Sequence, residues 1–528
     1  MSAAHFAARC PVQWRHFRGA YCRLLGPPYV AFHEIPFAAP PVGELRFKDP
    51  EPPVPWTGIR NCTTPNGTLC TQTIDVSSDY IFGSEDCLYL NVYTNSLNQS
   101  KPVIFWIHGG GFQQGTGSFK FIRPDYLITK DVVVVTVNYR LGPFGFLNLG
   151  HRVAPGNQGL KDVIAALEWV KENIAKFGGD PNNITIAGQS AGSVIAHALT
   201  LSPRAKGLFH KAILQSGLLT CKWGLGQSLP ERGFKFASLL GINSTDPEEI
   251  VEKLRKISDK DIVKAYEHFE FNKEHYYLYR MKFGLNYDDV AENPVLPLPI
   301  EQLGSNDVDI PVLAGYLSGE SLMFFNDISQ NALDNYNMYI PDYVKVLGDV
   351  ANLGPKEQGE LLKFVENQFF NGQPVTADNM DKFIRFVSSI YFTVPYKIYA
   401  EGRVNRALKP TYLYRFSYLG NEPTFADLMM KRILKVATHM DELAYLLYSP
   451  PCKSKNLEPP AIGTKDRSLI EFLCTTWSNF ARTGNPTPCH DDVVKITWEP
   501  MTKENRCYLE IGDSIDMLPM ATDLINLI

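Results

Sequence analysis

The feature that most constrains the fold is the stretch 184–193, which reads ITIAGQSAGS. An apolar, β-branched run leads into Gly-x-Ser-x-Gly and the apolar segment 194–199 leads out of it, an order typical of strand, sharp turn and helix. Such a turn forces Ser190 into a strained backbone conformation, and a Cβ two residues to either side would collide with a neighbouring strand or helix. The Ser190 hydroxyl then stands at a helix N-terminus, where free N–H groups favour a developing negative charge.

Gly-x-Ser-x-Gly alone is also explained by an ordinary turn, because glycine and serine are common residues. A nucleophilic serine needs a base, a carboxylate and an oxyanion hole. The assignment of Ser190 therefore depends on whether the rest of the chain supplies these partners.

Near-continuous apolar runs mark the strands of the expected sheet. Segments 102–107 and 131–137 suit strands buried on both faces. Further strands are predicted at 88–93, 311–316 and 411–416, and short strands or turns at 29–32 and 35–38. A further αβ unit is predicted at 208–215, and helices at 159–174 and 469–483. We expect an α/β fold with a large, mostly parallel central sheet and helices on both faces. Polar helical stretches at 230–305 and 326–409 are interpreted as insertions into a single catalytic domain over 1–528.

Composition excludes several classes of partner. Hydrophobic residues make up 45% and charged residues 20% of the 528 residues, the balance of a globular protein. The net charge is only −5 and no long basic run occurs, so nucleic acid is not an expected partner. No run of about 18 apolar residues occurs, so no membrane span is expected. The oligomeric state stays open between monomer and dimer.

The compartment also stays open. Residues 1–20 contain several basic side chains and no apolar core, so they are not a secretory signal, which allows a cytoplasmic location. Asn-x-Ser/Thr sequons favour a secretory history and glycosylation; they begin at Asn61, Asn66, Asn98, Asn183 and Asn243. Cys70 and Cys87 bound a short loop that one disulfide bridge could close.

The run His108-Gly109-Gly110-Gly111-Phe112 follows the buried strand at 102–107. Glycines there let the backbone approach a ligand and point N–H groups at it, although a plain β-turn would need no more. Together with the later Gly-x-Ser-x-Gly, the run is far more specific. We expect the N–H groups of Gly110, Gly111 and Ala191 to bind an oxyanion, each lowering the barrier by about 3 kcal/mol.

A carboxylate and then a histidine should follow the serine in the chain. Glu320 comes directly after the predicted strand at 311–316, at the sheet edge that the serine also faces. Taken alone, it would more often be a solvated surface group. His439 is one of 11 histidines, and its place after the Glu-bearing strand selects it.

Many ordered segments resemble the carboxylesterase/cholinesterase family of α/β-hydrolases along nearly the whole chain; they are 37–47, 84–91, 108–112, 138–140, 156–162, 177–181, 188–192 and 214–217. The resemblance implies Ser190 as nucleophile, His439 as general base and then acid, and Glu320 as the residue that orients His439. It also implies a Cys70–Cys87 disulfide, ion pairs Arg46–Glu85 and Arg140–Asp162, and Ser216 close behind the triad.

The departures from the family pattern bear on the substrate. Cholinesterases have glutamate where this chain has Gln189, and the stretch 71–86 lacks the tryptophan that binds their cationic substrates. Choline esters are therefore not expected. Gln189 is similar to the Gly-Gln-Ser-Ala-Gly of insect juvenile hormone esterases and some insect carboxylesterases, but Val163 and Val436 depart from the hormone-esterase pattern. Ser321 replaces a usual glycine, and Trp223 stands where the family has an acyl-pocket tryptophan.

The sequence thus predicts a serine hydrolase of lipophilic, xenobiotic, hormone or pheromone esters that needs no metal and no organic cofactor. The alternatives are a non-catalytic binding or adhesion member of the same fold, and a stoichiometric scavenger of esters or organophosphates with slow deacylation. Relatives of the first kind lack the serine, the histidine or the oxyanion glycines, all of which are present here.

Overall fold

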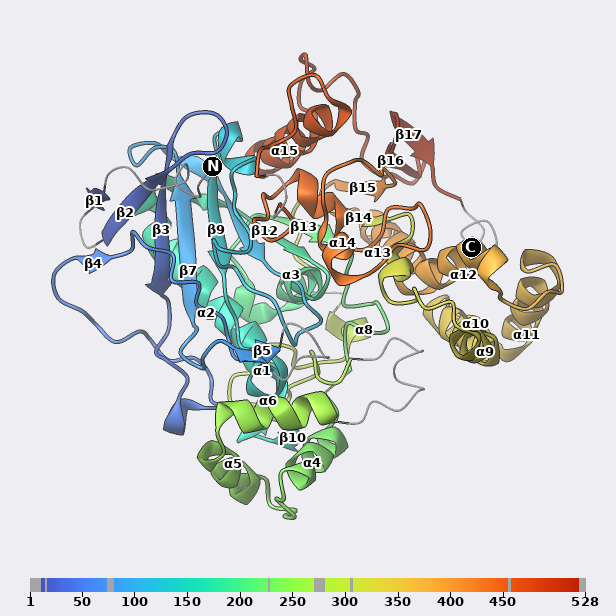
Figure 1. Ribbon diagram of the computed structural model, residues 1–528, viewed down its shortest axis with the longest axis horizontal. Helices are drawn as coiled ribbons and strands as arrows, with labels where there is room; N and C mark the ends of the chain where they lie inside the picture. Colours follow the sequence, from blue (N-terminus) through green and yellow to red (C-terminus); the bar gives the residue numbers. More distant parts are fainter. Residues whose placement is uncertain are drawn as a thin grey trace.

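A computed structural model describes residues 11–14, 17–73, 80–226, 228–269, 281–303, 307–453 and 457–521. In these ranges a 13-stranded sheet forms the centre, in the order β1-β2-β3-β7-β9-β8-β12-β13-β14-β15-β16-β17, with β4 paired to β2. Figure 1 shows the strands crossing the molecule between helices. The first ten residues, on which the prediction about a secretory signal partly depends, lie outside the described ranges.

The strands of the main sheet are β1 (Pro11–Trp14), β2 (Phe17–Cys22), β3 (Tyr29–Pro36), β4 (Arg60–Asn61), β7 (Tyr89–Thr94), β8 (Lys101–Ile107), β9 (Val133–Val137), β12 (Gly179–Gln189), β13 (Lys211–Gln215), β14 (Val312–Leu317), β15 (Thr411–Phe416), β16 (Cys507–Ile511) and β17 (Ile515–Pro519). Two small sheets pair β5 (Gln72–Thr73) with β6 (Ile81–Phe82) and β10 (Asn148–His151) with β11 (Ala154–Pro155).

The α-helices are α1 (Gly142–Phe146), α2 (Gln158–Asn173), α3 (Ala191–Leu201), α4 (Pro230–Leu239), α5 (Pro247–Lys256), α6 (Asp259–His268), α8 (Ile300–Leu303), α9 (Gln330–Met338), α10 (Ile340–Val350), α11 (Pro355–Phe364), α12 (Met380–Ser388), α13 (Val394–Asn405), α14 (Phe425–Met429) and α15 (Lys465–Thr483). Short 3₁₀ turns η7 (Glu320–Met323) and η11 (Asp441–Tyr445) matter for the site.

The sheet is covered on both faces, as expected. Every residue of β8 is buried. Val103, Phe105 and Ile107 pack in the core that includes α2 and α3, whereas Ile104 and Trp106 pack in the core that includes α15. Because both faces of the strand meet apolar side chains, the apolar run is nearly continuous.

The central strands β9, β8, β12, β13, β14, β15 and β16 run parallel, and the pairs at both ends are antiparallel. The predicted mostly parallel sheet is therefore confirmed. The segments 29–32 and 35–38, predicted as separate short strands or turns, are not separate, because the single strand β3 runs from Tyr29 to Pro36. Its register on β7 shifts between Phe32 and Ile35, and Glu34 has a φ of 54°, so a bulge lets pairing continue.

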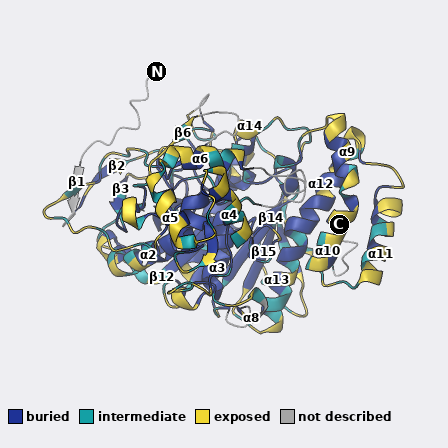
Figure 2. Cartoon of the chain, turned by 90° about the horizontal axis from the view of Figure 1, so that it is seen from below, coloured by how far each residue is buried: buried dark blue, intermediate teal, exposed yellow. Residues whose placement is uncertain are grey.

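Helical segments occupy both predicted insertions. The helices α4, α5 and α6 lie together at the bottom of Figure 1, and α9 to α12 lie at its right. Figure 2 shows exposed residues on outlying helices such as α11, of which Leu361 is the buried member. Within the described ranges, no helix is long and apolar enough to cross a bilayer.

Covalent and ionic contacts implied by the family resemblance are present. Cys70 and Cys87 form a disulfide. Arg46 contacts Glu85, with Nε 2.7 Å from Oε2. Arg140 makes a fork with the buried Asp162, at 2.8 Å from Nε and 2.7 Å from Nη2. The first two contacts join segments that precede β7 to one another, and the third joins the segment after β9 to α2.

The sequons differ in accessibility. Asn61, Asn66, Asn98 and Asn243 are exposed. Asn183 is half-buried, its Nδ2 donates to the Arg482 carbonyl oxygen at 3.2 Å, and its Oδ1 accepts from Lys211.

Candidate active site

Ser190 lies at the turn between β12 and α3, where the sequence placed it. Its backbone has φ 56° and ψ −127°, a combination that is costly for a residue with a Cβ. A Cβ at Gly188 would collide with the Gly192 carbonyl, and a Cβ at Gly192 would collide with the carbonyls of Ile107 and His108. The two glycines therefore let strand and helix approach closely enough to form the turn.

The glycine run after β8 packs directly against this turn. A Cβ at Gly109 would lie 2.7 Å from the Gln189 carbonyl oxygen and 3.0 Å from Ser190 Cβ. Gly110 and Gly111 have φ values of 110° and 61°, and neither donates its N–H to another described residue. The N–H of Ala191, the first residue of α3, has no acceptor within the helix. Free donors thus lie on both sides of Ser190.

The His108 side chain packs against the glycine run and stabilises it. Its ring stacks on Tyr139, with centroids 4.4 Å apart, and its Nδ1 lies 2.8 Å from the Gly109 carbonyl oxygen. The Tyr139 hydroxyl donates to the His108 carbonyl oxygen at 2.9 Å. Burial lowers the pKa of His108 to about 4, so the ring is neutral near pH 7. A neutral, stacked ring holds the loop without adding a charge beside the free N–H groups.

Glu320 and His439 come together behind Ser190, although they lie far apart in the chain. Glu320 begins η7 after β14, and His439 lies just before η11. Nδ1 of His439 lies 2.6 Å from Oε2 of Glu320, and Oε1 accepts from the Leu317 N–H at 2.9 Å. Both side chains are buried. The carboxylate therefore fixes Nδ1 as the protonated ring nitrogen and leaves Nε2 as an acceptor.

In this structure the Gln189 side-chain amide lies against the Nε2 atom of His439. Its Nε2 lies 3.2 Å from His439 Nε2, and Ser190 Oγ makes no hydrogen bond to a described residue. An amide N–H fits the lone pair of Nε2, whereas a carboxylate oxygen at the same place would meet it with another lone pair. The sequence placed Gln189 beside the site but did not predict this contact.

Aromatic rings surround the histidine. The rings of Phe324 and Phe392 lie 5.4 and 5.6 Å from His439, and Trp223 lies 5.9 Å from Phe392. Trp223 also faces Gly217, since a Cβ there would lie 3.0 Å from its ring. Sequence reasoning singled out Trp223 but missed both phenylalanines, which belong to no motif that was recognised.

Ser216 and Ser321 are the other residues singled out from the sequence. Ser216 follows β13, has a φ of 53°, and donates its N–H to the Gly315 carbonyl oxygen at 2.9 Å. Its hydroxyl is buried and has no hydrogen-bond partner among the described residues, so its predicted role behind the triad stays a prediction. Ser321 fits within η7, where its N–H donates to Ser388 Oγ at 3.0 Å. The turn after Glu320 therefore forms without glycine.

Comparisons with known proteins identify the family to which this chain is similar. The sequence model of the Carboxylesterase family matches residues 11–523. Esterase FE4 of Myzus persicae is 34% identical over 494 residues, which cover 90% of this chain and 83% of that protein. Juvenile hormone esterase of Tribolium castaneum is 33% identical over 505 residues, which cover 92% and 84%.

The fold was also found in a solved structure. Juvenile hormone esterase from Manduca sexta, with OTFP covalently attached, superposes with a TM-score of 0.82 at 27% identity and covers 98% of each chain. The expected α/β-hydrolase fold and the expected insect-type relatives are both confirmed. The chain belongs to the carboxylesterase family and is a carboxylic ester hydrolase with the α/β-hydrolase fold.

Proposed function

We propose that the chain hydrolyses lipophilic carboxylic esters through an acyl-enzyme on Ser190, with His439 as general base and then general acid. The observation that carries the proposal is the buried His439–Glu320 pair, 2.6 Å apart, behind a serine held at a strained turn. This combination supports a nucleophile, a base and an orienting carboxylate acting as one unit.

The proton follows a defined route in this proposal. His439 Nε2 exchanges the Gln189 amide for the Ser190 hydroxyl and takes its proton as Oγ attacks the ester carbonyl. Glu320 accepts from Nδ1 throughout and stabilises the imidazolium. The alcohol then leaves with the proton from Nε2, and water repeats the sequence of steps on the acyl-enzyme and releases the acid.

The free N–H groups of Gly110, Gly111 and Ala191 donate hydrogen bonds to the negative charge that develops on the carbonyl oxygen of the ester. Each donor is worth about 3 kcal/mol of barrier lowering, because it is already oriented and needs no reorganisation. His108 supports this role, since its stacked ring and its bond to Gly109 keep the loop in place.

A lipophilic substrate is supported by the surroundings of the serine. Phe324, Phe392 and Trp223 supply apolar rings. The segment 71–86 has no tryptophan, and Gln189 carries no charge, so neither provides a cation site. Apolar pockets discriminate by about 1–3 kcal/mol per methylene, so we propose broad selectivity among hydrophobic esters.

The test compares two serine substitutions at opposite ends of α3. Ser190→Ala should abolish hydrolysis of a short-chain nitrophenyl ester, with a loss of about 10⁴-fold or more. Ser202→Ala is the control, because its buried hydroxyl bonds Val295 far from the nucleophile. An organophosphate should add one phosphoryl group to the peptide that contains Ser190. Turnover by Ser190→Ala, or a label elsewhere, would refute the assignment.

A further inference from the structure

The segment 430–440, which carries His439, forms neither helix nor strand. It links α14 to η11, and backbone hydrogen bonds of regular structure do not fix its path. The position of the imidazole therefore depends on side chains that fasten this segment to its surroundings.

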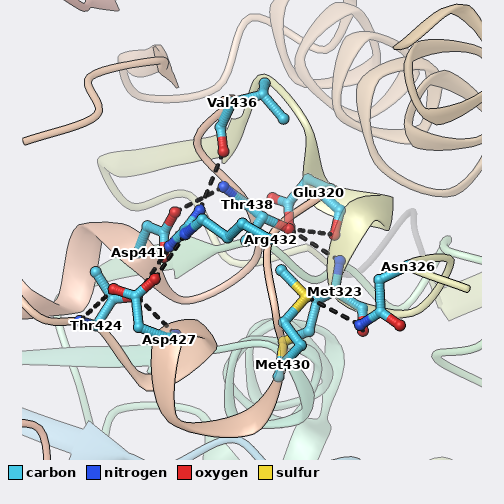
Figure 3. Close-up of polar contacts among 10 residues, drawn as sticks. All are labelled: Glu320, Met323, Asn326, Thr424, Asp427, Met430, Arg432, Val436, Thr438 and Asp441. Atoms are coloured by element: carbon cyan, nitrogen blue, oxygen red, sulfur yellow. Dashed lines mark hydrogen bonds and ion pairs between the residues drawn. The ribbon is translucent and has the colours of Figure 1, made fainter. Parts of the chain in front are cut away.

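Arg432 is the residue that bonds most widely within this region. Its Nε donates to Asp427 Oδ1 at 2.7 Å, and its Nη1 donates to the Val436 carbonyl oxygen at 3.1 Å. Nη2 donates to Thr424 Oγ1 at 3.0 Å and to Asp441 Oδ1 at 2.6 Å. Figure 3 shows the guanidinium lying among these groups. The planar fork of one side chain thus joins the residues before, within and after the segment.

Through Asp441, Arg432 is connected by hydrogen bonds to Glu320. Asp441 Oδ2 accepts from the Thr438 N–H at 2.8 Å. Thr438 Oγ1 accepts from the Met323 N–H at 3.0 Å and donates to the Glu320 carbonyl oxygen at 3.3 Å. Thr438 directly precedes His439. A continuous series of bonds therefore runs from Arg432 to the turn that holds Glu320 (Figure 3).

Two further bonds fasten the same pair of segments. The Gly319 N–H donates to the Ala437 carbonyl oxygen at 2.8 Å, and Asn326 Nδ2 lies 3.0 Å from Met430 Sδ. These bonds hold the segments together, and the Asp441 N–H closes the turn at 438–441 by donating to the Thr438 carbonyl oxygen at 3.0 Å. The Asp441 carboxylate reinforces this turn, because its two oxygens accept from Arg432 and from the Thr438 N–H.

Charge makes Arg432 essential to this arrangement. The Asp441 side chain is 2% exposed and that of Arg432 is 16% exposed. Burial raises the pKa of the Asp441 carboxyl, whereas the hydrogen bond from Arg432 opposes this rise. Without Arg432, the buried Asp441 carboxylate would lose its ion-pair partner and keep the Thr438 N–H as its backbone donor, and an unpaired buried charge is costly. The carboxylate would therefore protonate or turn outward and release the Thr438 N–H.

We propose that Arg432 is a positioning residue for His439 in the reaction proposed above: through Asp441 and Thr438 it fixes the imidazole between Glu320 and Ser190. The inference rests on the proposed triad and adds a residue that belongs to no motif recognised in the sequence. A misplacement of about 1 Å in a catalytic group can lower a rate about 100-fold.

The experiment measures kcat and KM on a nitrophenyl ester, normalised to the number of Ser190 sites that an organophosphate labels at completion. Arg432→Met should lower kcat per site about 10- to 100-fold and change KM less than about threefold, because binding does not need the base. Arg432→Lys should recover most of that loss, since it restores the charge beside Asp441. If Arg432→Met does not accumulate as folded protein, Arg432→Lys and Asp441→Asn provide the same comparison with milder changes.

Arg403→Met is the matched control, because Arg403, which lies on α13, makes a buried ion pair with Asp307 and does not contact the histidine segment. It should lower the Tm and leave kcat per site unchanged. In an Asp441→Ala background, Arg432→Met should cause little further loss.

Three results would overturn the proposal: Arg432→Met that lowers the Tm but retains wild-type kcat per site, Arg432→Lys that is as slow as Arg432→Met, or losses that add in the double variant. A wild type that neither hydrolyses the ester nor labels at Ser190 would instead refute the proposed function itself.

Discussion

The buried Glu442 carboxyl allows a quantitative prediction of how the stability of the protein depends on pH. Glu442 follows the histidine segment and is 1% exposed. Oε1 accepts from Gln215 Nε2 at 3.0 Å, and Oε2 has no hydrogen-bond partner among the described residues. Burial, with the Glu320 carboxylate nearby, raises the pKa of Glu442 from 4.5 to about 8. Near pH 7 the folded protein therefore holds this carboxyl mostly in its protonated, neutral form.

The unfolded chain releases this proton at its ordinary pKa of 4.5, and the folded chain releases it at about 8. Between these values the folded state binds one more proton, so the free energy of unfolding falls as the pH rises through the window. At about 1.4 kcal/mol per pH unit, the whole window is worth about 5 kcal/mol. The portion between about pH 5 and about pH 9 is about 4 kcal/mol.

Glu442→Gln isolates this contribution, because glutamine is the same shape, stays neutral and still offers an oxygen to Gln215. Relative to wild type, the variant should gain about 4 kcal/mol in the free energy of unfolding between about pH 5 and about pH 9. With an unfolding entropy of about 1.1 kcal/mol/K for 528 residues, the Tm difference should grow by about 4 °C.

Thermal unfolding followed by tryptophan fluorescence across this pH range measures the difference. Glu504→Gln makes the same chemical change at an exposed position and should run parallel to wild type. Parallel curves for Glu442→Gln and wild type would refute the reasoning, since they would mean that the buried carboxyl is already ionised at low pH.

Three further predictions concern the site and its support. Gln189→Glu should move the acid limb of the pH profile of kcat/KM to higher pH by about one pH unit or more. The reason is that a carboxylate 3.2 Å from His439 Nε2 would stabilise the imidazolium. An acid limb at the wild-type pH would contradict the contact between residue 189 and His439. Trp223→Leu should raise the ratio of kcat/KM for octanoyl over acetyl nitrophenyl esters about tenfold, and an unchanged ratio would remove Trp223 from the acyl pocket. Cys87→Ser should lower the free energy of unfolding by about 3 kcal/mol, since the Cys70–Cys87 disulfide spans 17 residues. A reductant should destabilise the wild type by the same amount and leave the stability of the variant unchanged.

The parallel centre of the sheet could be predicted because its strands are buried on both faces. The prediction for β15 (Thr411–Phe416) matches the structure at both ends, and β8 begins one residue earlier than predicted and ends where predicted. The strands β16 and β17 at the C-terminal edge could not be found in this way. β16 alternates buried and half-buried residues over a short length, and no residue of β17 is fully buried, so neither carries a continuous apolar run.

The chain order of serine, glutamate and histidine, with the glycine loop, predicted Ser190, Glu320 and His439. The structure places Glu320 2.6 Å from His439, and His439 3.2 Å from Gln189, the residue before Ser190. Arg432, Thr438 and Asp441 could not be selected. Their contacts depend on the path of an irregular segment, and no periodicity or spacing specifies which oxygen a guanidinium will meet. Similarly, the Gln189 contact depends on which way one amide turns in three dimensions.

The backbone conformation of Ser190 also bears on how such a protein evolves. A residue without a Cβ adopts φ 56° and ψ −127° freely, whereas serine forfeits about 1–3 kcal/mol of folding free energy there. Replacement of this proposed nucleophile by glycine should thus raise the free energy of unfolding, although on the proposed mechanism it would end hydrolysis. In a duplicated gene that is no longer selected for ester hydrolysis, this substitution would increase the stability of the fold while removing its activity. The product would keep a folded surface that could serve in binding alone.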